Sequence, residues 1–243
     1  MERGLYIAAS GMLAEQVRQD QIANDLANAS TPGYKPDRAA QGAFDEMLLH
    51  TTSTGAGIGS MSLGTGIVEL RTDLSQGPLS QTGNPLDLAL SGPGFFAVQT
   101  PQGIRYTRDG QFTTDAQGRL STVTGFTVLG ANGKPITISD TTSVTIAPDG
   151  AVTSNGRAAG RISVVSLTKA VKEGDTLFSG TAGARPQVTQ VEQGYIEGSG
   201  VEPARAMVDM IVSLRAYEST QRVLHALDDT LGEATSRVGS ANS

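Results

Sequence analysis

The sequence predicts an α+β fold in which N- and C-terminal α-helices pack as an antiparallel, coiled-coil-like pair around a central, mainly antiparallel β domain. Two patterns predict this fold. Near both termini, apolar residues recur at alternating three- and four-residue steps, which is the spacing of one helix face. Between the termini, short strand-like runs alternate with Asn-Gly, Asp-Gly and Gln-Gly pairs, which are typical of tight hairpin turns.

Residues 1–30 are predicted to form the N-terminal helix of a terminal-helix domain. The helix should end before Pro32-Gly33, because proline cannot continue a helix and glycine permits a sharp turn. Burying a large apolar side chain contributes roughly 1.5–3 kcal/mol, whereas ordering one backbone residue costs about 1–2 kcal/mol. We therefore expect this helix to be ordered only against a partner. Its predicted contact stripe consists of Leu5, Ala8 or Ala9, Met12, Gln16, Gln19, Ala23 and Leu26.

Residues 31–70 are predicted to be a connecting ribbon or loop. Glycines at positions 55, 57, 59, 64 and 66 favour turns and extended backbone in its second half. The run Gly55-Ala56-Gly57-Ile58-Gly59 superficially resembles a nucleotide-binding loop. Such a loop needs a strand before it and a helix after it, and neither pattern is present. The sequence therefore indicates no nucleotide site here.

Residues 71–180 are predicted to form the central β domain, and residues 181–202 the return connection. Turn pairs lie at 102–103, 109–110, 117–118, 132–133, 149–150 and 155–156. We expect a hairpin at each pair, with glycine supplying the positive φ. Aromatic side chains in these strands are expected in the core rather than on a ligand platform. The predicted strands are residues 95–98, 104–107, 111–113, 126–129, 135–138, 144–146 and 162–165.

Residues 203–243 are predicted to form the C-terminal helix of the terminal-helix domain. Pro203 suits the first helical turn, where the missing N–H has no helical partner to lose. A heptad-like apolar stripe follows, which favours a seam of the coiled-coil kind. The stripe consists of Met207, Met210 or Ile211, Leu214, Tyr217, Gln221, Leu224 and Leu231.

Composition excludes several classes of protein. The chain has 243 residues, of which 38% are hydrophobic and only 5% aromatic, with no tryptophan, so we expect a thin core for this length. The absence of cysteine rules out disulfides, thiolate metal sites and thiol catalysis. A net charge of −6 argues against nucleic acid as a partner.

The residues that could support catalysis do not form a recognisable site. His50 and His225 are the two histidines, and no nucleophile motif or zinc-binding histidine pair accompanies them. Asp109 and Asp115 lie in predicted turns, where aspartate is a common turn former. We therefore predict no catalytic residue, no cofactor and no metal site.

Motifs at both ends and in the middle of the chain form a set. The N-terminal motif is Asn24-Asp25-Leu26-Ala27-Asn28-Ala29-Ser30-Thr31-Pro32-Gly33-Tyr34-Lys35. The central blocks are Asp87-Leu88-Ala89-Leu90, Gly92-Pro93-Gly94-Phe95-Phe96 and Tyr106-Thr107-Arg108-Asp109-Gly110-Gln111-Phe112, and the C-terminal block is Gln193-Gly194-Tyr195-Ile196-Glu197-Gly198-Ser199-Gly200-Val201. This set resembles the flagellar basal-body rod and hook protein family, and is most like its proximal-rod member, with the distal-rod member second. The resemblance covers most of the chain and departs at Gly200, where the family usually has asparagine.

Two of these motifs also suggest local contacts from their chemistry alone. Asn24 and Asn28 lie one helical turn apart, so their amides can bond across a helix interface or cap the helix end. Arg108 precedes a predicted turn and can pair with a carboxylate such as Asp87.

The resemblance implies a structural subunit of the bacterial flagellar basal-body rod, polymerised with other axial proteins into the helical drive shaft that transmits torque from motor to hook. The implied partners are other rod and axial subunits, further copies of the chain, and the flagellar type III export apparatus. The implied location is the basal body, outside the cytoplasmic membrane. The implied assembly interface consists of Leu5, Met12, Asn24, Leu26, Asn28, Pro32, Gly33, Tyr34, Met207, Met210, Ile211, Leu214, Arg215, Tyr217 and Leu224.

An alternative from another class is a secreted, β-rich adhesion or carbohydrate-binding module whose helical termini serve as a stalk. The N-terminus has no basic region followed by an apolar run, and no stretch reaches membrane-spanning length, so we expect neither a cleaved secretory signal nor membrane insertion. Electron microscopy of the purified protein separates the two functions, because a stalked module stays discrete where a rod subunit associates.

Overall fold

The computed structural model of the protein describes residues 2–43, 46–50, 52, 55, 57–62, 64–139, 143–174 and 176–240. The chain divides into two compact units. The helical unit comprises Met1–Ala27, Asp37–Arg71 and Pro203–Ser243, and the β unit comprises Asn28–Pro36 and Thr72–Glu202. The chain therefore passes from one unit to the other four times.

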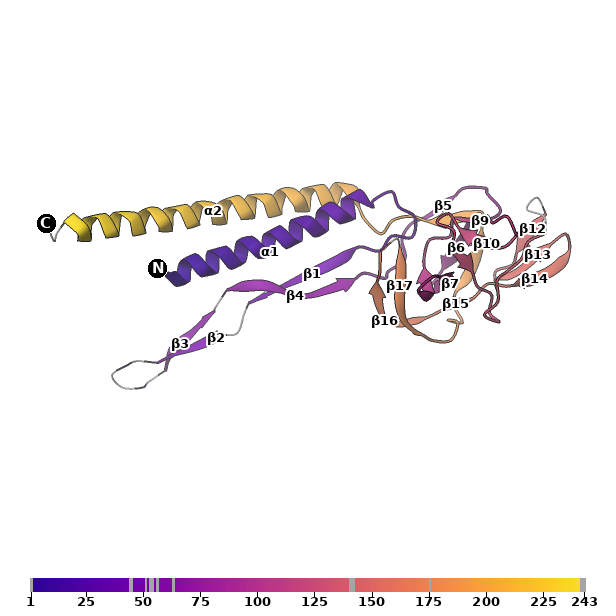
Figure 1. Ribbon diagram of the computed structural model, residues 1–243, viewed down its shortest axis with the longest axis horizontal. Helices are drawn as coiled ribbons and strands as arrows, with labels where there is room; N and C mark the ends of the chain where they lie inside the picture. Colours follow the sequence, from indigo (N-terminus) through magenta and orange to yellow (C-terminus); the bar gives the residue numbers. More distant parts are fainter. Residues whose placement is uncertain are drawn as a thin grey trace. The chain divides into compact units, whose positions relative to one another are not determined.

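The helical unit contains two long helices, α1 (Glu2–Ala27) and α2 (Pro203–Ser240). They run side by side in opposite directions (Figure 1). The direction follows from contacts along their length: a side chain at Gly4 would meet Leu227, a side chain at Gly11 would meet Thr220, and Ser213 hydrogen-bonds Glu15. The predicted antiparallel pair of terminal helices is confirmed.

The buried face of α1 agrees only in part with the predicted stripe. Ala8, a predicted stripe residue, is buried, and so are Ala14 and Ile22, which lie off the stripe, whereas Gln16 and Ala23, both on it, are exposed. Small side chains such as Ala8 and Ala14 let the two helix backbones approach closely. Large Ile22 is buried as well, so side-chain size alone does not select the buried face.

The helical unit also contains two two-stranded sheets, both formed by the segment 37–71. Strand β1 (Asp37–Ala43) pairs with β4 (Thr65–Thr72), and β2 (Glu46–His50) pairs with β3 (Gly57–Ser62). Strand β1 lies against α1, where the Gln21 side-chain amide donates to the carbonyl of Asp37 and Gln41 donates to Glu15 at 3.2 Å. In the described part of this segment, strands β1 to β4 make up most of the backbone.

The β unit is built around an eight-stranded antiparallel sheet with the order β16-β17-β8-β7-β11-β10-β9 and with β15 paired to β7. Smaller antiparallel sheets, β12-β13-β14, β18-β6 and β19-β5, complete the unit. The strands of the large sheet are β7 (Phe95–Thr100), β8 (Gly103–Thr107), β9 (Phe112–Thr114), β10 (Leu120–Thr122), β11 (Thr127–Val128), β15 (Val164–Val165), β16 (Leu167–Lys172) and β17 (Leu177–Ala182). Those of the small sheets are β5 (Leu79–Gln81), β6 (Leu88–Ser91), β12 (Val144–Ile146), β13 (Ala151–Ser154), β14 (Arg157–Arg161), β18 (Gln190–Gln193) and β19 (Tyr195–Glu197).

One continuous apolar core fills the β unit. Leu88, Phe96 and Val98 have no solvent-exposed surface, and the rings of Phe96 and Phe112 meet edge to face at 5.2 Å. The predicted core role of the aromatic residues is confirmed. Burial on this scale gives the β unit a source of stability of its own.

Two local predictions in the β unit are wrong. The pair at 109–110 does not close a hairpin, because β8 pairs with β7 and β17 while β9 pairs with β10. Residues 135–138 form isolated bridges to Leu129 and Arg119 rather than a strand. By contrast, the pair at 155–156 makes the expected two-residue turn between β13 and β14, with positive φ at both positions.

Candidate assembly interface

Apolar side chains stand on the exposed surface of α2. The predicted seam residues divide into two sets. Met210, Tyr217 and Leu224 are half-buried, and they share the helix face of Ser213, which is fully buried against α1. Met207, Ile211 and Leu214 are 49%, 52% and 46% exposed, and Arg215 is exposed beside them. Helix α2 therefore has one face that α1 covers and another apolar face that it leaves in solvent.

Helix α1 shows the same division. Leu5, Met12 and Leu26 are half-buried. Tyr6 and Leu13, seven residues apart, are 69% and 64% exposed. Single exposed apolar residues are ordinary on a protein surface, but rows of them along two helices are the mark of an interaction site.

The N-terminal motif ends α1 and turns the chain into the β unit. Asn24 is exposed on the last turns of α1, and α1 ends at Ala27. Asn28 organises the following turn, since its carbonyl accepts from the Thr31 amide at 3.1 Å and its side-chain oxygen accepts from the Thr31 hydroxyl at 3.2 Å. Half-buried Pro32 follows this turn, so the expected sharp end of the helix is present.

Gly33 is required where it stands, for two reasons. Its φ is +68°, which side-chain-bearing residues adopt at a cost. A Cβ at this position would also lie 2.4 Å from the amide nitrogen of Asp109. The Gly33 amide donates to the carbonyl of Glu197 at 2.8 Å. The motif thus packs directly against backbone of the β unit.

Tyr34 is buried beside the C-terminal block. Its carbonyl accepts from the Gly200 amide at 2.9 Å, and the Lys172 ammonium lies 3.9 Å from the centre of its ring. A side chain at Gly200 would come within 2.9 Å of Pro36. The departure from asparagine at this position therefore suits the close packing of the two segments in this chain.

Lys35, Arg108 and Glu197 meet in a buried charged cluster. Their side chains are 0%, 2% and 0% exposed. The Lys35 ammonium donates to one carboxylate oxygen of Glu197 and to the carbonyl of Ser75, the latter at 2.5 Å. The Gly77 amide donates to that same carboxylate oxygen at 2.8 Å. The other oxygen lies 3.3 Å from Arg108 Nη1, and Arg108 Nη2 donates to the carbonyl of Gly92 at 2.7 Å.

Burial shapes the ionisation of this cluster. It lowers the pKa of Lys35, and the hydrogen bond and negative charge of Glu197 oppose that shift. Burial likewise lowers the pKa of Arg108, again opposed by the charge of Glu197. The predicted pairing of Arg108 with a carboxylate is confirmed, but the carboxylate belongs to Glu197 and not to Asp87. Asp87 accepts instead from the Asn84 side chain at 2.9 Å, while Glu197 reaches Arg108 from the C-terminal block.

Comparisons with known proteins agree with these motifs along the chain. Residues 5–35 match the family described as Flagella basal body rod protein, residues 89–154 match Flagellar hook protein FlgE/F/G D1 domain, and residues 192–237 match Flagellar basal body rod FlgEFG protein C-terminal. The flagellar basal-body rod protein FlgF of Caulobacter vibrioides is 34% identical over 256 residues, with 100% of both chains covered. The chain belongs to the flagellar basal-body rod protein family.

Other relatives in this rod family have similar identities. The flagellar hook-basal body complex protein FlhO of Bacillus subtilis is 33% identical over 270 residues, covering 98% of this chain and 99% of its own. The rod protein FlgG of Agrobacterium fabrum is 34% identical over 260 residues, covering 93% and 96%. The predicted family, its structural rather than enzymatic nature and its place in the flagellar basal body are confirmed.

The three charged residues of the cluster were not among the predicted interface residues. Each lies in a different rod-family motif: Lys35 closes the N-terminal motif, Arg108 stands in a central block and Glu197 in the C-terminal block. The available signal was a charge in each motif, but Asp25 and Asp109 lie in the first two motifs as well, so the charges alone did not single out the trio. Their convergence needed the fold, since Lys35 and Glu197 are 162 positions apart.

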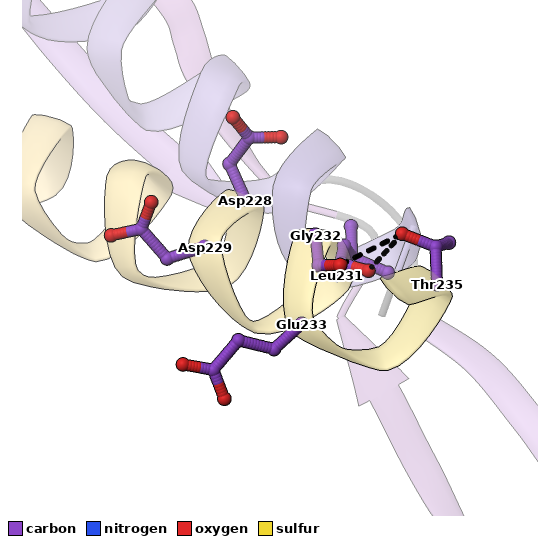
Figure 2. Close-up of a pocket in the computed structure, with 6 residues that line it drawn as sticks. All are labelled: Asp228, Asp229, Leu231, Gly232, Glu233 and Thr235. Carbon is purple, nitrogen blue, oxygen red and sulfur yellow. Dashed lines mark hydrogen bonds between the residues drawn. The ribbon is translucent and has the colours of Figure 1, made fainter. Parts of the chain in front are cut away.

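Among the described residues, a shallow pocket near the C-terminal end of α2 has no converging polar side chains that would form a binding site (Figure 2). Figure 2 shows the carboxylates of Asp228, Asp229 and Glu233 pointing in different directions from the helix. The Thr235 hydroxyl donates to carbonyls of its own helix, at 3.0 Å and 2.9 Å. Within the described ranges, no group of three or more metal-ligating side chains converges, and no helix has the length and hydropathy to cross a membrane. His225 is exposed on α2, and the side chain of His50 lies outside the described part.

Proposed function

We propose that the chain polymerises with other axial subunits into the helical drive shaft that transmits torque from the flagellar motor to the hook. The observation that carries this proposal is the apolar surface of α1 and α2 that neither helix covers. Burial of such surface is the main favourable contribution to protein association. Partners that present similar helix pairs would cover it, and further copies of this chain are among the candidates.

In this proposal the predicted interface residues have separate tasks. Met207, Ile211 and Leu214 contact neighbouring subunits, with Arg215 at the edge of that surface. Leu5, Met12, Leu26, Met210, Tyr217 and Leu224 hold α1 against α2. Asn24, Asn28, Pro32, Gly33 and Tyr34 end α1 and lead the chain into the β unit.

The proposed organisation follows the five predicted segments. Residues 1–30 and 203–243 form the terminal-helix domain, 31–70 the connecting ribbon, 71–180 the central β domain and 181–202 the return connection. We further propose export through the flagellar type III apparatus, without membrane insertion and without nucleic acid. The proximal rod is the proposed position, supported by the end-to-end similarity to FlgF of Caulobacter vibrioides.

Leu214→Asp tests the proposed contact surface. Leu214 is 46% exposed in the single chain, so we expect the β unit and the helix pair to remain folded. An unpaired carboxylate buried between subunits is costly, so incorporation into basal bodies should be lost. Ser219→Asp, at an exposed polar position on the same helix, is the matched control and should support swimming. Normal motility of the Leu214→Asp strain would refute the surface.

A further inference from the structure

Glu197 joins every segment by which the chain crosses between the two units. The crossings lie at 27/28, 36/37, 71/72 and 202/203. We define the segments just inside the β unit as 28–36, 72–77 and 197–202. The Glu197 carbonyl accepts from the Gly33 amide, and its carboxylate accepts from Lys35 in the first segment and Gly77 in the second. Glu197 itself belongs to the third segment, so this one residue joins the first two segments to the third.

Arg108 ties this meeting point to the large sheet. It follows β8 directly, its guanidinium lies 3.3 Å from the Glu197 carboxylate, and its central carbon lies 5.6 Å from the centre of the Phe95 ring. Phe95 belongs to β7 and is itself buried. The three crossing segments are therefore attached, through Glu197 and Arg108, to a buried strand of the large sheet.

We propose that Glu197, with Lys35 and Arg108, forms a charge clamp that fixes the crossing segments to the β unit and closes only when the C-terminal block is in place. The proposal rests on the geometry of the β unit and does not depend on polymerisation. A failure to assemble rods would leave it standing, and a failure of the clamp would leave the apolar surface of the helices unchanged.

The charge balance of the cluster makes Glu197 its essential member. Two cations and one anion are buried together, so Glu197 is the single negative charge within the trio, and the charge of Asp73 acts on Lys35 more weakly than that of Glu197. Removing Glu197 leaves two buried positive charges without their main partner, which is strongly unfavourable. Removing Lys35 leaves Arg108 and Glu197 as a balanced pair. An ordinary packing role would show no such asymmetry between the two positions.

The need for a counter-charge sets the order in which the parts of the clamp come together. Lys35 and Arg108 both precede Glu197, Lys35 by 162 positions. Until the C-terminal block docks, burial of either cation at this site lacks the compensating charge. The segment that follows α1 should therefore dock on the β unit as a late step, after strand β19 has joined β5.

Amide exchange of three full-length variants tests the clamp. In Glu197→Gln, the amides of Gly33, Gly77 and Gly200 should exchange about a hundredfold faster or more, the range expected from breaking a buried ion pair. The core amides of Leu120 and Leu129, which donate to the carbonyls of Ile136 and Ala97 at 2.9 Å, should keep their wild-type rates. Lys35→Met should accelerate the same three glycines by less than about tenfold. Glu173→Gln removes a partly exposed ion pair with Arg105 and is the matched control, with no change expected.

Several outcomes would overturn the clamp. One is equal acceleration at the core amides and at the three glycines in Glu197→Gln, which would make Glu197 an ordinary core residue. Another is an effect of Lys35→Met as large as that of Glu197→Gln. If Glu197→Gln does not fold, amide exchange of Lys35→Met is the test of the clamp. Faster exchange confined to the three glycines supports the clamp, and loss of core protection refutes it.

Discussion

The two units of this protein handle apolar side chains in opposite ways. In the β unit, Phe96 and Val98 are completely enclosed, and the core that surrounds them is continuous. In the helical unit, Leu13 is 64% exposed and Val212 is 53% exposed. Apolar burial within the single chain is therefore concentrated in the β unit. In the proposed function, other subunits cover the apolar surface that the helical unit leaves in solvent.

Polar contacts repeat this contrast. Between α1 and α2, fully buried Ser213 donates to the Glu15 carboxylate at 2.6 Å, which fixes how the helices align without adding much burial. In the β unit, buried polar groups occupy a network of charges and backbone amides around Glu197. In the proposed function, the Ser213 contact aligns a helix pair that other subunits later cover, whereas the buried network around Glu197 is complete within the single chain.

The largest expected effect is a difference in amide exchange between the units of the monomer. Residues 2–27 and 205–240 should exchange at least about a thousandfold faster than buried amides within 86–165, because local opening of a little-buried helix pair costs far less than global unfolding. Hydrogen exchange of the monomeric protein read by mass spectrometry gives both rates in one sample. Similar protection in the two regions would contradict the view that the helical unit is the less stable of the two.

A smaller effect should distinguish the sharp turn at Gly33, which we call the corner, from an ordinary exposed turn: alanine at Gly33 should destabilise the protein more. Gly33→Ala forces a side-chain-bearing residue to a φ of +68° and places its Cβ against the backbone of residues 108 and 109. Gly83→Ala shares the first penalty, with a φ of +75°, but its Cβ would have no neighbour among the described residues within 4 Å. We expect about 1–2 kcal/mol of destabilisation for Gly83→Ala, and roughly 1–3 kcal/mol more for Gly33→Ala from the steric conflict.

Urea unfolding of the β unit, followed by circular dichroism, measures both values. Equal losses in the two variants would mean that the corner yields without disturbing the β unit. The N-terminal motif would then be attached more loosely than its contacts indicate.

Sequence reasoning predicted what local pattern determines. The helix end before Pro32-Gly33 and the core strand at Phe95 and Phe96 follow from residue chemistry within a few positions. The buried face of α1 was predicted only in part: Ala8 is buried as expected, whereas the burial of Ala14 and Ile22 depends on what packs against the helix and not on the pattern within it.

The sequence did not predict the charged cluster of Lys35, Arg108 and Glu197 either, for a related reason. Nothing local distinguishes Glu197 from Asp87 as the partner of Arg108. The choice depends on the fold: β19 pairs with β5, and Glu197 at the end of β19 then meets both Lys35 and Arg108. Contacts between distant segments depend on the topology of the fold. The motifs show which residues are candidates for such contacts, but not which of them pair with one another.

The smallest expected effect concerns Asp109, where the β unit buries a carboxylate next to the corner. Burial raises the pKa of Asp109, the amide of Gln111 opposes the shift, and the charge of Asp87 adds to it. The folded protein therefore holds this proton at a pH where the unfolded chain has lost it. The resulting stabilisation is present below the unfolded pKa and disappears as the pH rises through the folded pKa.

Asp109→Asn isolates this contribution, because the amide oxygen can still accept from the Gln111 backbone amide at 2.9 Å. The wild type should gain stability relative to Asp109→Asn when the pH is lowered from 7 towards 4, and the difference should vanish for a matched change at exposed Asp149. Urea midpoints at several pH values give the comparison. The opposite result would be a wild type that loses stability relative to Asp109→Asn on acidification. It would show that Asp109 is in contact with water. The β unit would then be packed less tightly beside the N-terminal motif than its contacts indicate.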